Sequence, residues 1–544
     1  MKIRIVKFFT IQLDLDLRHI RSVIDFLKNH TILLLIITLS VISVLSFIYY
    51  YIIELGFLYN DARSHLDIGR RVVENLKPGF AQLGSVWLPL PHLLMIPTIW
   101  NDFMWHSGLS GAIQSMISYV GTSLFIYLLL RELKIDLFGR LIGVGVFAFN
   151  LNILYIQSTA MTELLLLATM TAAVYELIVW YKDENLLRLL RIGFWVLLST
   201  LIRYDGWFLF LFITVIIFSH IFYKYGYKKA EGTVILFATF AGFGILLWFL
   251  WNFMIFKDPM YFVFGPYSAN AQQKAMEAAG ALPTKYNLYI SFITYMYAFI
   301  YNSNPFFIFI AFIGACIMWF DKRIKSGVRI ASVTLFVPLF FNIFALYFGH
   351  SSLYVKDIMG SWFNVRYGLV MIPTMAIFIG YFVHKIKSMR YLFLGLFFFI
   401  TFFSYVNAEA VSLDDAISGS SGKNVKEVSG WLKKNAKEAE GFVLISVASH
   451  DAIIFSSGMQ MSRFIHEGTG DYWDMATAHP SSWARWIIMR TYDEGDSTFR
   501  SLRYNKEFVN NYKLIYKYPF ADIYEIKEQY LSQLNLQPVS YMNR

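Results

Sequence analysis

Residues 31–65 read TILLLIITLSVISVLSFIYYYIIELGFLYNDARSH, an apolar run that leads directly into a polar stretch. A membrane-spanning helix needs about 20 mostly apolar residues, and no charged residue interrupts the run between Thr31 and Ile53. This run therefore predicts a transmembrane helix. The polar stretch continues to Pro97 and contains an acid, histidines, arginines and four prolines. Polar groups beside a bilayer are expensive to desolvate, so their presence points to function.

The composition of the whole chain also indicates a polytopic membrane protein. Of its 544 residues, 57% are hydrophobic, 19% aromatic and only 15% charged, which lies outside the range of soluble globular domains. The single cysteine, Cys316, leaves neither a disulfide nor a cysteine metal site available. The formal net charge is +10. In a membrane protein such a charge indicates basic cytoplasmic loops more often than nucleic-acid binding.

Eleven apolar runs predict about eleven transmembrane helices. With the N-terminus inside, every short loop rich in Lys and Arg falls on the cytoplasmic side, as the positive-inside rule requires. The agreement holds only if the chain turns at Arg203–Gly206, between two separate spans. Basic cytoplasmic loops then account for the net positive charge, and nucleic-acid binding is not needed to explain it. The predicted runs are 31–53, 109–130, 139–157, 163–181, 188–202, 206–223, 232–256, 304–320, 331–348, 368–384 and 391–407.

The runs divide the chain into three regions. Residues 1–30 alternate apolar and charged residues and predict a cytoplasmic amphipathic helix. Residues 31–407 form the transmembrane domain, whose first external loop, 54–108, contains the polar stretch. Residues 408–544 predict a small external α/β domain. We expect a multi-pass protein of the plasma membrane, with the N-terminus in the cytoplasm. Segment 257–303 is compatible with an interfacial helix, a re-entrant loop or two short spans.

The tail shows the periodicities of both helices and strands. A helix is predicted after residue 424, a strand over Phe442–Val447, and another helix around Ser482–Arg490. Two alternating segments about a Pro-Phe turn, within 512–526, predict a β-hairpin.

Helical spacing over residues 57–77 singles out one acid. The apolar residues of this segment form one stripe, whereas Asp67 and Arg70 face away from it. We expect the helix to lie on the outer membrane surface with its apolar side down. Asp61 and His65, one turn apart, fall at the border of the stripe. There Asp61 is placed to act as a general base; the alternative is that it only caps the helix.

Five short motifs resemble those of GT-C glycosyltransferases, in particular prokaryotic relatives of protein mannosyltransferases and aminoarabinose transferases. The likeness covers nearly all of the membrane part, and every motif falls on the predicted external face. The motifs are Tyr59-Asn60-Asp61-Ala62-Arg63-Ser64-His65, Trp87-Leu88-Pro89-Leu90-Pro91-His92, Met161-Thr162-Glu163, Arg203-Tyr204-Asp205-Gly206-Trp207 and Asn364-Val365-Arg366-Tyr367-Gly368.

The resemblance implies transfer of a hexose-type sugar from a polyprenyl (dolichyl) phosphate donor to an acceptor hydroxyl, with inversion. The family's base lies on the first external loop, which matches Asp61 here. Glu163 resembles the second acidic position, where it would orient the acceptor or a metal ion; the alternative is a carboxylate in water at the membrane border. The expected acceptor is a glycan, a protein or a lipid. The transmembrane domain is expected to contact membrane lipids.

Basic and aromatic residues of the external loops are the candidates for substrate binding. Arg366 and Lys356 are expected to bind the donor phosphate, because a guanidinium fork matches phosphate oxygens; for Lys356 the alternative is snorkelling to headgroups. Arg203 is expected to pair with Asp205. No cofactor is required. His65 and His92 with Glu163 lack the ligand spacing of a metal site, and the metal is left open. The remaining binding candidates are Arg63, His65, Trp87, His92 and Tyr367.

Two rival functions are also considered. Transporters place ionisable residues near the membrane midplane on broken, repeated helices, whereas the ionisable residues here gather at the outer edge. An oligosaccharyltransferase is the closer rival, because it is also a GT-C enzyme. Its Trp-Trp-Asp-Tyr-Gly signature shares residue types, but not their order, with Asp471-Tyr472-Trp473-Asp474.

Overall fold

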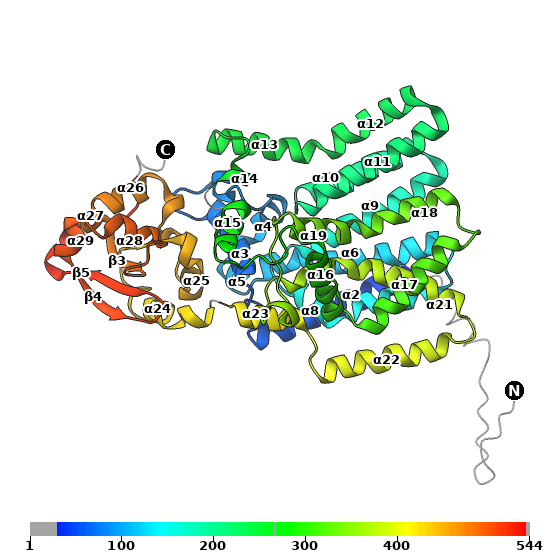
Figure 1. Cartoon of the computed structure of the whole chain (residues 1–544). Coiled ribbons are helices and arrows are strands. Elements are labelled where there is room, and N and C mark those ends of the chain that lie inside the picture. The colour runs from blue at the N-terminus through cyan, green and yellow to red at the C-terminus, as the bar shows by residue number, and fades with distance from the viewer. Residues whose placement is uncertain (1–29, 266–267, 421, 540–544) are drawn as a thin grey trace, which may run out of the picture.

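The computed structural model describes residues 30–265, 268–420 and 422–539. A bundle of long helices forms one part of the molecule, and a small sheet domain stands at one end of the bundle (Figure 1). The amphipathic helix predicted for residues 1–30 lies outside the described residues, apart from residue 30 itself. We call the end of the bundle that carries the sheet domain the sheet-domain end.

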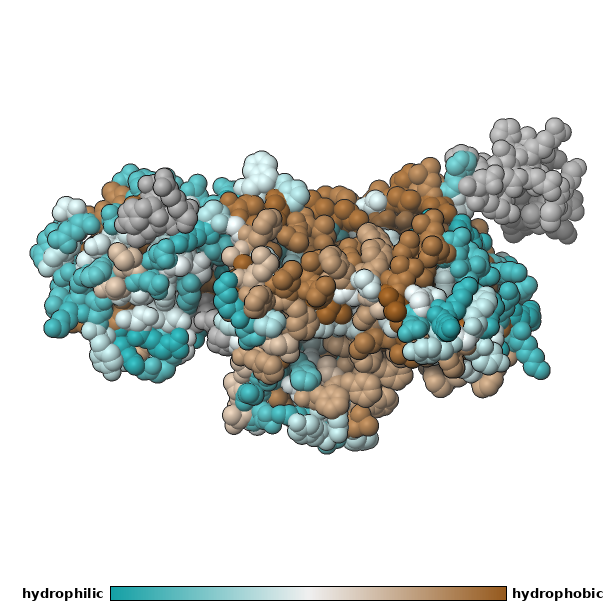
Figure 2. All heavy atoms as spheres, turned by 90° about the horizontal axis from the view of Figure 1, so that it is seen from above, coloured by the Kyte–Doolittle hydropathy of each residue, from teal (hydrophilic) through white to brown (hydrophobic). Residues whose placement is uncertain are grey.

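Long apolar helices confirm a multi-spanning helical protein. Among the described residues, seven helical stretches are long and apolar enough to cross a membrane, and two bent helix pairs raise this number to nine if each pair is one span. On the face seen in Figure 2, apolar residues cover the middle of the molecule and hydrophilic residues gather at both ends. The seven stretches are Thr31–Ile52, Leu109–Glu132, Glu163–Asp183, Asp205–Tyr225, Ser326–Tyr347, Val365–Lys385 and Arg390–Gly419.

The two remaining predicted runs form shorter helices. Run 139–157 is divided into α7 (Leu137–Ala148) and α8 (Leu151–Ile156), because Asn150 caps a new helix. Run 188–202 is α10 (Leu186–Thr200); its 15 residues rise about 22 Å, less than the roughly 30 Å of a hydrocarbon core. The predicted count of eleven spans is therefore not confirmed.

A sharp bend follows the segment whose topology the sequence left open. α16 (Leu288–Asn302) meets α17 (Pro305–Phe320) at 109°, the geometry of a broken span or a re-entrant loop. The other bent pair, at 47°, is α12 (Tyr227–Ala241) and α13 (Phe243–Phe256). The further elements of the helical part are α2 (Thr31–Ile52), α3 (Asn60–Val73), η1 (Phe80–Leu83), α4 (Leu90–Ile99), α5 (Asp102–His106), α6 (Leu109–Glu132), α9 (Glu163–Asp183), α11 (Asp205–Tyr225), α14 (Tyr261–Phe264), α15 (Ala269–Ala278), α18 (Ser326–Ser332), η2 (Val333–Phe336), α19 (Val337–Tyr347), α20 (Lys356–Met359), η3 (Val365–Met371), α21 (Ile372–Lys385), α22 (Arg390–Val406) and α23 (Val411–Gly419).

The sheet domain contains one five-stranded sheet in the order β2-β1-β3-β5-β4. The strands β2, β1 and β3 are parallel, whereas β5 runs antiparallel to β3 and to β4. The strand predicted at Phe442–Val447 and the predicted hairpin are confirmed. The strands are β1 (Phe442–Ile445), β2 (Phe464–Ile465), β3 (Ala484–Met489), β4 (Tyr512–Lys517) and β5 (Asp522–Ile526). The helices are α24 (Gly422–Asn435), α25 (Val447–Ser457), η4 (Met461–Arg463), η5 (Glu467–Thr469), α26 (Asp471–Ala478), α27 (Pro480–Trp483), α28 (Ser497–Leu502), α29 (Lys506–Asn511) and η6 (Glu528–Gln533).

One secondary-structure prediction in the tail is wrong. The helix expected around Ser482–Arg490 is β3, which lies between β1 and β5 in the middle of the sheet. Trp486, Ile487 and Ile488 are all buried. A central strand that is covered on both faces has a continuous apolar run instead of an alternating one, so its pattern resembles that of a short buried helix.

Small residues let the membrane helices approach closely. Gly314 of α17 lies so near α21 that a Cβ atom there would overlap the carbonyl oxygen of Phe378. On α7, a Cβ atom at Gly139 would come within 2.7 Å of the carbonyl oxygen of Gly380. Small residues at such contacts are typical of helix packing in membranes, where backbones gain dispersion contacts by close approach.

This packing predicts that Gly314→Ala destabilises the bundle, because the added methyl group must displace the α21 backbone. Overpacking of this kind costs roughly 1–3 kcal/mol, so the Tm of the purified protein in detergent should fall by several degrees. Gly395→Ala on α22 is the matched control, because its Cβ atom would meet open space. Equal Tm values for the two variants would contradict the close approach of α17 and α21.

Candidate active site

Residues from four of the motifs meet at the sheet-domain end of the bundle. Asp61 lies in the first turn of α3, and Glu163 is the first residue of α9. Arg203 lies in the turn between α10 and α11, and Arg366 is the second residue of η3. Each side chain therefore sits at a helix end, so the lengths and packing of the helices set its position.

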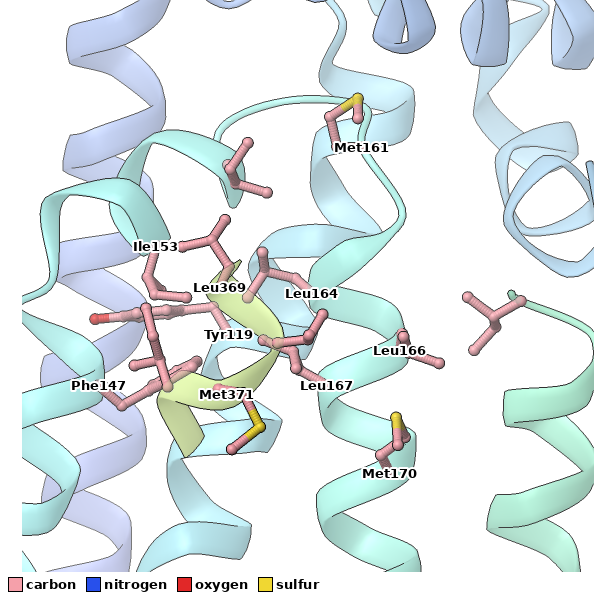
Figure 3. Packing of buried hydrophobic residues seen from close by; sticks show 14 of the residues in the cluster. Tyr119, Phe147, Ile153, Met161, Leu164, Leu166, Leu167, Met170, Leu369 and Met371 are labelled. Carbon is pink, nitrogen blue, oxygen red and sulfur yellow. The ribbon is translucent and has the colours of Figure 1, made fainter. Parts of the chain in front are cut away.

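Apolar packing fixes η3 against α9 directly beside these charged groups. Leu369 and Met371 of η3 are buried, and they face Leu164 and Leu167 of α9 (Figure 3). Close-packed interiors have few voids, so η3 cannot slide along α9 without opening one. This contact sets where Arg366 lies relative to Glu163.

The charged side chains form a continuous chain of ion pairs, which we call the charge chain. Arg366 Nη2 lies 2.5 Å from Asp61 Oδ2, and Arg366 Nε lies 3.0 Å from Glu163 Oε1. Arg203 Nη1 lies 3.3 Å from the same Glu163 oxygen, and Arg203 Nε lies 3.2 Å from Asp205 Oδ2. The charge chain runs acid, arginine, acid, arginine, acid, and it contains the predicted pair of Arg203 with Asp205.

Glu163 occupies the centre of the charge chain and is 0% exposed. The alternative that it is a carboxylate in water at the membrane border is therefore wrong. Removing a carboxylate from water is so unfavourable that it needs paired, hydrogen-bonded cations. Arg203 and Arg366 supply them, so Glu163 holds the two guanidinium groups next to each other.

Asp61 differs from Glu163 because it is partly open. Its side chain is 39% exposed. Among the residues that the structure describes, none donates a hydrogen bond to Asp61 Oδ1. The N-cap of α3 is Tyr59, and no side-chain cap hydrogen bond is present. The alternative that Asp61 merely caps the helix is therefore wrong. Its place in the first turn lets the helix dipole stabilise the carboxylate.

A cavity of about 820 Å³ opens onto the charge chain, within the size range of small-molecule sites. Asp61, Arg203 and Arg366 form a polar side, whereas phenylalanines of α11, α14 and α19 form an apolar side. Asn270 and His350 also line it, and no sequence pattern pointed to either. Six predicted site residues line the cavity, namely Asp61, His65, Trp87, Arg203, Arg366 and Tyr367.

The other predicted site residues lie outside this lining. Glu163 is buried behind the arginines. Arg63 donates a hydrogen bond to the carbonyl oxygen of Phe57, at 2.9 Å, and another to Asn60. The ammonium group of Lys356 lies 5.2 Å from the ring centroid of Trp362. The predicted contact of Lys356 with the donor site is thus not seen.

His65 and His92 form a buried pair. His65 Nδ1 lies 2.8 Å from His92 Nε2, and the indole of Trp87 covers the His65 ring at 4.5 Å between centroids. Burial lowers the pKa of His65 to about 3 and also lowers the pKa of His92, so both rings are neutral at pH 7. No cluster of three or more His, Cys, Asp or Glu side chains that could hold a metal ion occurs in the described part of the chain.

The expectation that the polar face of α3 is exposed to water is wrong. Asp67 and Arg70 were predicted to face water, but both are buried. Asp67 Oδ1 accepts a hydrogen bond from Trp105 Nε1 at 3.0 Å, and Arg70 pairs with Asp102 at 2.5 Å. Helix α25 of the sheet domain packs onto the same helix. Periodicity within one helix cannot reveal a cover that comes from a remote part of the chain.

The most important residue that the sequence did not indicate is Asp415. Its Oδ2 accepts hydrogen bonds from Tyr59 Oη at 2.9 Å and from the backbone N–H of Val365 at 3.1 Å. These two residues belong to the motifs that carry Asp61 and Arg366. Asp415 follows the last predicted span, in a region without a recognisable motif, so no signal in the sequence distinguished it.

The structure is similar to several solved structures at low sequence identity. These include the oligosaccharyltransferase of Archaeoglobus fulgidus in the apo form, with 11% identity, a TM-score of 0.47 and coverage of 85% of this chain and 70% of that one. The archaeal oligosaccharyltransferase AglB of the same organism, in complex with an inhibitory peptide and a dolichol-phosphate, has 11% identity, a TM-score of 0.45 and coverage of 85% and 69%. ArnT from Cupriavidus metallidurans bound to undecaprenyl phosphate has 8% identity, a TM-score of 0.49 and coverage of 90% and 98%.

No protein-family model and no curated protein matches the sequence.

The burial of Glu163 predicts a large loss of stability in Glu163→Ala. This variant leaves the buried guanidinium group of Arg366 and the partly buried one of Arg203 short of a counter-charge, and removing one partner of a buried ion pair costs about 3–5 kcal/mol. The Tm in detergent should fall steeply. Asp471→Ala is the control, because Asp471 is 64% exposed in its pair with Lys77, and its loss should cost no more than about 1 kcal/mol. A Glu163→Ala variant as stable as Asp471→Ala would show that Glu163 is hydrated.

Proposed function

We propose that the protein is a GT-C-type membrane glycosyltransferase that moves a hexose-type sugar from a polyprenyl-phosphate donor to an acceptor hydroxyl at the external face. The observation that carries this proposal is the cavity, in which a partly open carboxylate and two arginines face an apolar wall. A lipid-linked sugar phosphate has matching parts: an anionic phosphate, a polar sugar and a hydrocarbon chain. The motif resemblance points to the same chemistry.

Arg203 and Arg366 are suited to bind the donor phosphate. Tyr367 lies beside both guanidinium groups, with its ring centroid 5.3 Å from each. The two cations thus flank one aromatic ring on the polar side of the cavity. Guanidinium groups match phosphate oxygens with parallel hydrogen bonds, and the apolar side would accept the first isoprene units of the donor.

Asp61 is proposed as the general base. Its Oδ1 would take the proton of the acceptor hydroxyl while the hydroxyl oxygen forms a bond to the anomeric carbon. The bond between that carbon and the phosphate oxygen breaks, and its electron pair leaves with the polyprenyl phosphate. Attack opposite to the leaving group inverts the anomeric centre. The arginines stabilise the negative charge that grows on the leaving phosphate.

In this scheme Glu163 does not touch the substrate. It is enclosed between Arg203 and Arg366, so its role is to hold the two guanidinium groups at the spacing that a phosphate needs. The neutral pair of His65 and His92 adds hydrogen-bonding capacity without adding charge. Trp87 offers an aromatic face at the cavity wall against which a sugar ring could pack.

The rival functions have less support. A transporter needs ionisable residues near the midplane, but the charge chain lies at helix ends on the sheet-domain end of the bundle. For an oligosaccharyltransferase, the acid–Trp segment Asp471–Asp474 would have to contribute to the site. Asp471 instead pairs with Lys77 of the first loop, and none of the four residues lines the cavity.

Asp61→Asn should abolish sugar transfer, because a carboxamide cannot take the proton of the acceptor. General-base catalysis contributes about 10²–10⁴-fold, so activity should fall by at least two orders of magnitude. The assay incubates purified protein with a panel of polyprenyl-phosphate sugars and candidate acceptors, and detects products by mass spectrometry. Asp258→Asn is the control, because this exposed acid lies outside the cavity. Near-normal transfer by Asp61→Asn would sink the assignment of the base.

Arg366→Lys should raise the KM for the donor far more than that for the acceptor. A single ammonium group cannot span Asp61 and Glu163 as the guanidinium does, and it lacks the fork that matches a phosphate. Lys356→Ala should leave both KM values unchanged, because Lys356 is outside the cavity lining. If donor and acceptor KM values rose equally in Arg366→Lys, the arginine would have a structural role alone.

A further inference from the structure

Asp415 is a buried carboxylate that the proposed chemistry does not use. It lies on α23, is 4% exposed, and does not line the cavity. A buried carboxylate must be hydrogen-bonded to be tolerated. Two hydrogen-bond donors, Tyr59 Oη and the N–H of Val365, approach the same oxygen, Oδ2, and they come from segments about three hundred residues apart in the sequence.

These two donors belong to the backbone segments that carry Asp61 and Arg366. Tyr59 is the N-cap of α3, two positions before Asp61, and its ring centroid lies 4.7 Å from the Arg366 guanidinium. Val365 immediately precedes Arg366. One carboxylate oxygen therefore ties the start of α3 to the start of η3 from outside the lining of the cavity.

The start of η3 is a turn that several hydrogen bonds hold in place. Asn364 has a φ of +55°, in the left-handed region that asparagine adopts more readily than most other non-glycine residues. Its side chain donates a hydrogen bond to the carbonyl oxygen of Ser352 at 3.0 Å. The carbonyl oxygen of Val365 accepts a hydrogen bond from Asn302 Nδ2 at 2.6 Å. Asp415 completes this clamp by binding the N–H of Val365.

Hydrogen bonds attach helix α23 to the bundle, and they hold Asp415 in place. The backbone N–H and the hydroxyl of Ser412 both donate to Asn152 Oδ1, at 2.9 and 2.8 Å. Asn152 Nδ2 in turn donates to the carbonyl oxygen of Asn302 at 3.2 Å. The same network thus holds α8, α16, α23 and η3.

We propose that Asp415 is a positioning residue that keeps the Asp61 carboxylate and the Arg366 guanidinium in register by holding Tyr59 and Val365. This inference rests on the proposed function. It identifies a residue outside the cavity on which the geometry of the catalytic site depends. A misplacement of about 1 Å from a remote change can cost on the order of 10²-fold in rate. Loss of Asp415 should therefore reduce turnover without removing any group that touches the substrate.

The test compares Asp415→Ala, Asp415→Asn and Tyr59→Phe with Asp414→Ala, a control at the neighbouring exposed acid. The kcat with the best polyprenyl-phosphate sugar should fall roughly 10–100-fold in Asp415→Ala. Asp415→Asn keeps an acceptor oxygen and should restore most of the rate. Tyr59→Phe removes one hydroxyl and leaves the ring beside Arg366, so it should cause a smaller loss even if Asp415→Ala folds poorly. Asp414→Ala should match the wild type.

Hydrogen–deuterium exchange of the full-length protein gives a readout that does not depend on activity. Asp415→Ala should increase exchange in peptides covering residues 57–66 and 362–370, whereas Asp414→Ala should not. Wild-type kcat in Asp415→Ala, or a lost kcat with unchanged exchange in both peptides, would overturn the positioning role. If the wild type transferred no polyprenyl-phosphate sugar but Asp415→Ala still loosened both peptides, the proposed function would fail and the clamp would stand.

Discussion

Much of this structure depends on the burial of one carboxylate, that of Glu163. A carboxylate with no exposed surface is stable only beside cations, and its two partners, Arg203 and Arg366, come from distant segments. Those arginines also pair with Asp205 and Asp61. The ends of α3, α9, α11 and η3 are therefore bound to one another by charge. Any shift between these helices leaves a buried charge without its partner.

The sequence predicted the helical membrane architecture and the residues that gather at the charge chain. The multi-spanning helical architecture is confirmed, and residues from four of the motifs do meet at one end of the bundle, because each stands at a helix end. The sequence could not show that Glu163 is enclosed, or that Arg63 and Lys356 lie outside the lining of the cavity. Such details depend on side-chain directions set by tertiary packing, as does the double burial that made β3 resemble a helix.

The role of Asp415 and the cover over α3 were hidden for a related reason. Both come from the chain after the last predicted span, where no motif is recognisable. The sheet domain covers α3 through α25, pairs Asp471 with Lys77, and accepts a hydrogen bond from Gln82 at the carbonyl oxygen of Gly468. The tail thus completes the burial of a polar helix that would otherwise lie in water.

The apolar wall of the cavity has a consequence for how a substrate reaches it. Phe344 and Phe348 line the cavity, yet they are 43% and 51% exposed, so the wall continues onto the outer surface of the bundle. A lipid-borne molecule could then enter sideways, by diffusion in the plane of the bilayer. Its effective concentration would be its mole fraction among the lipids. Diluting the membrane with inert lipid would therefore slow its encounter with the protein, even when the total amount of the molecule in the sample stays the same.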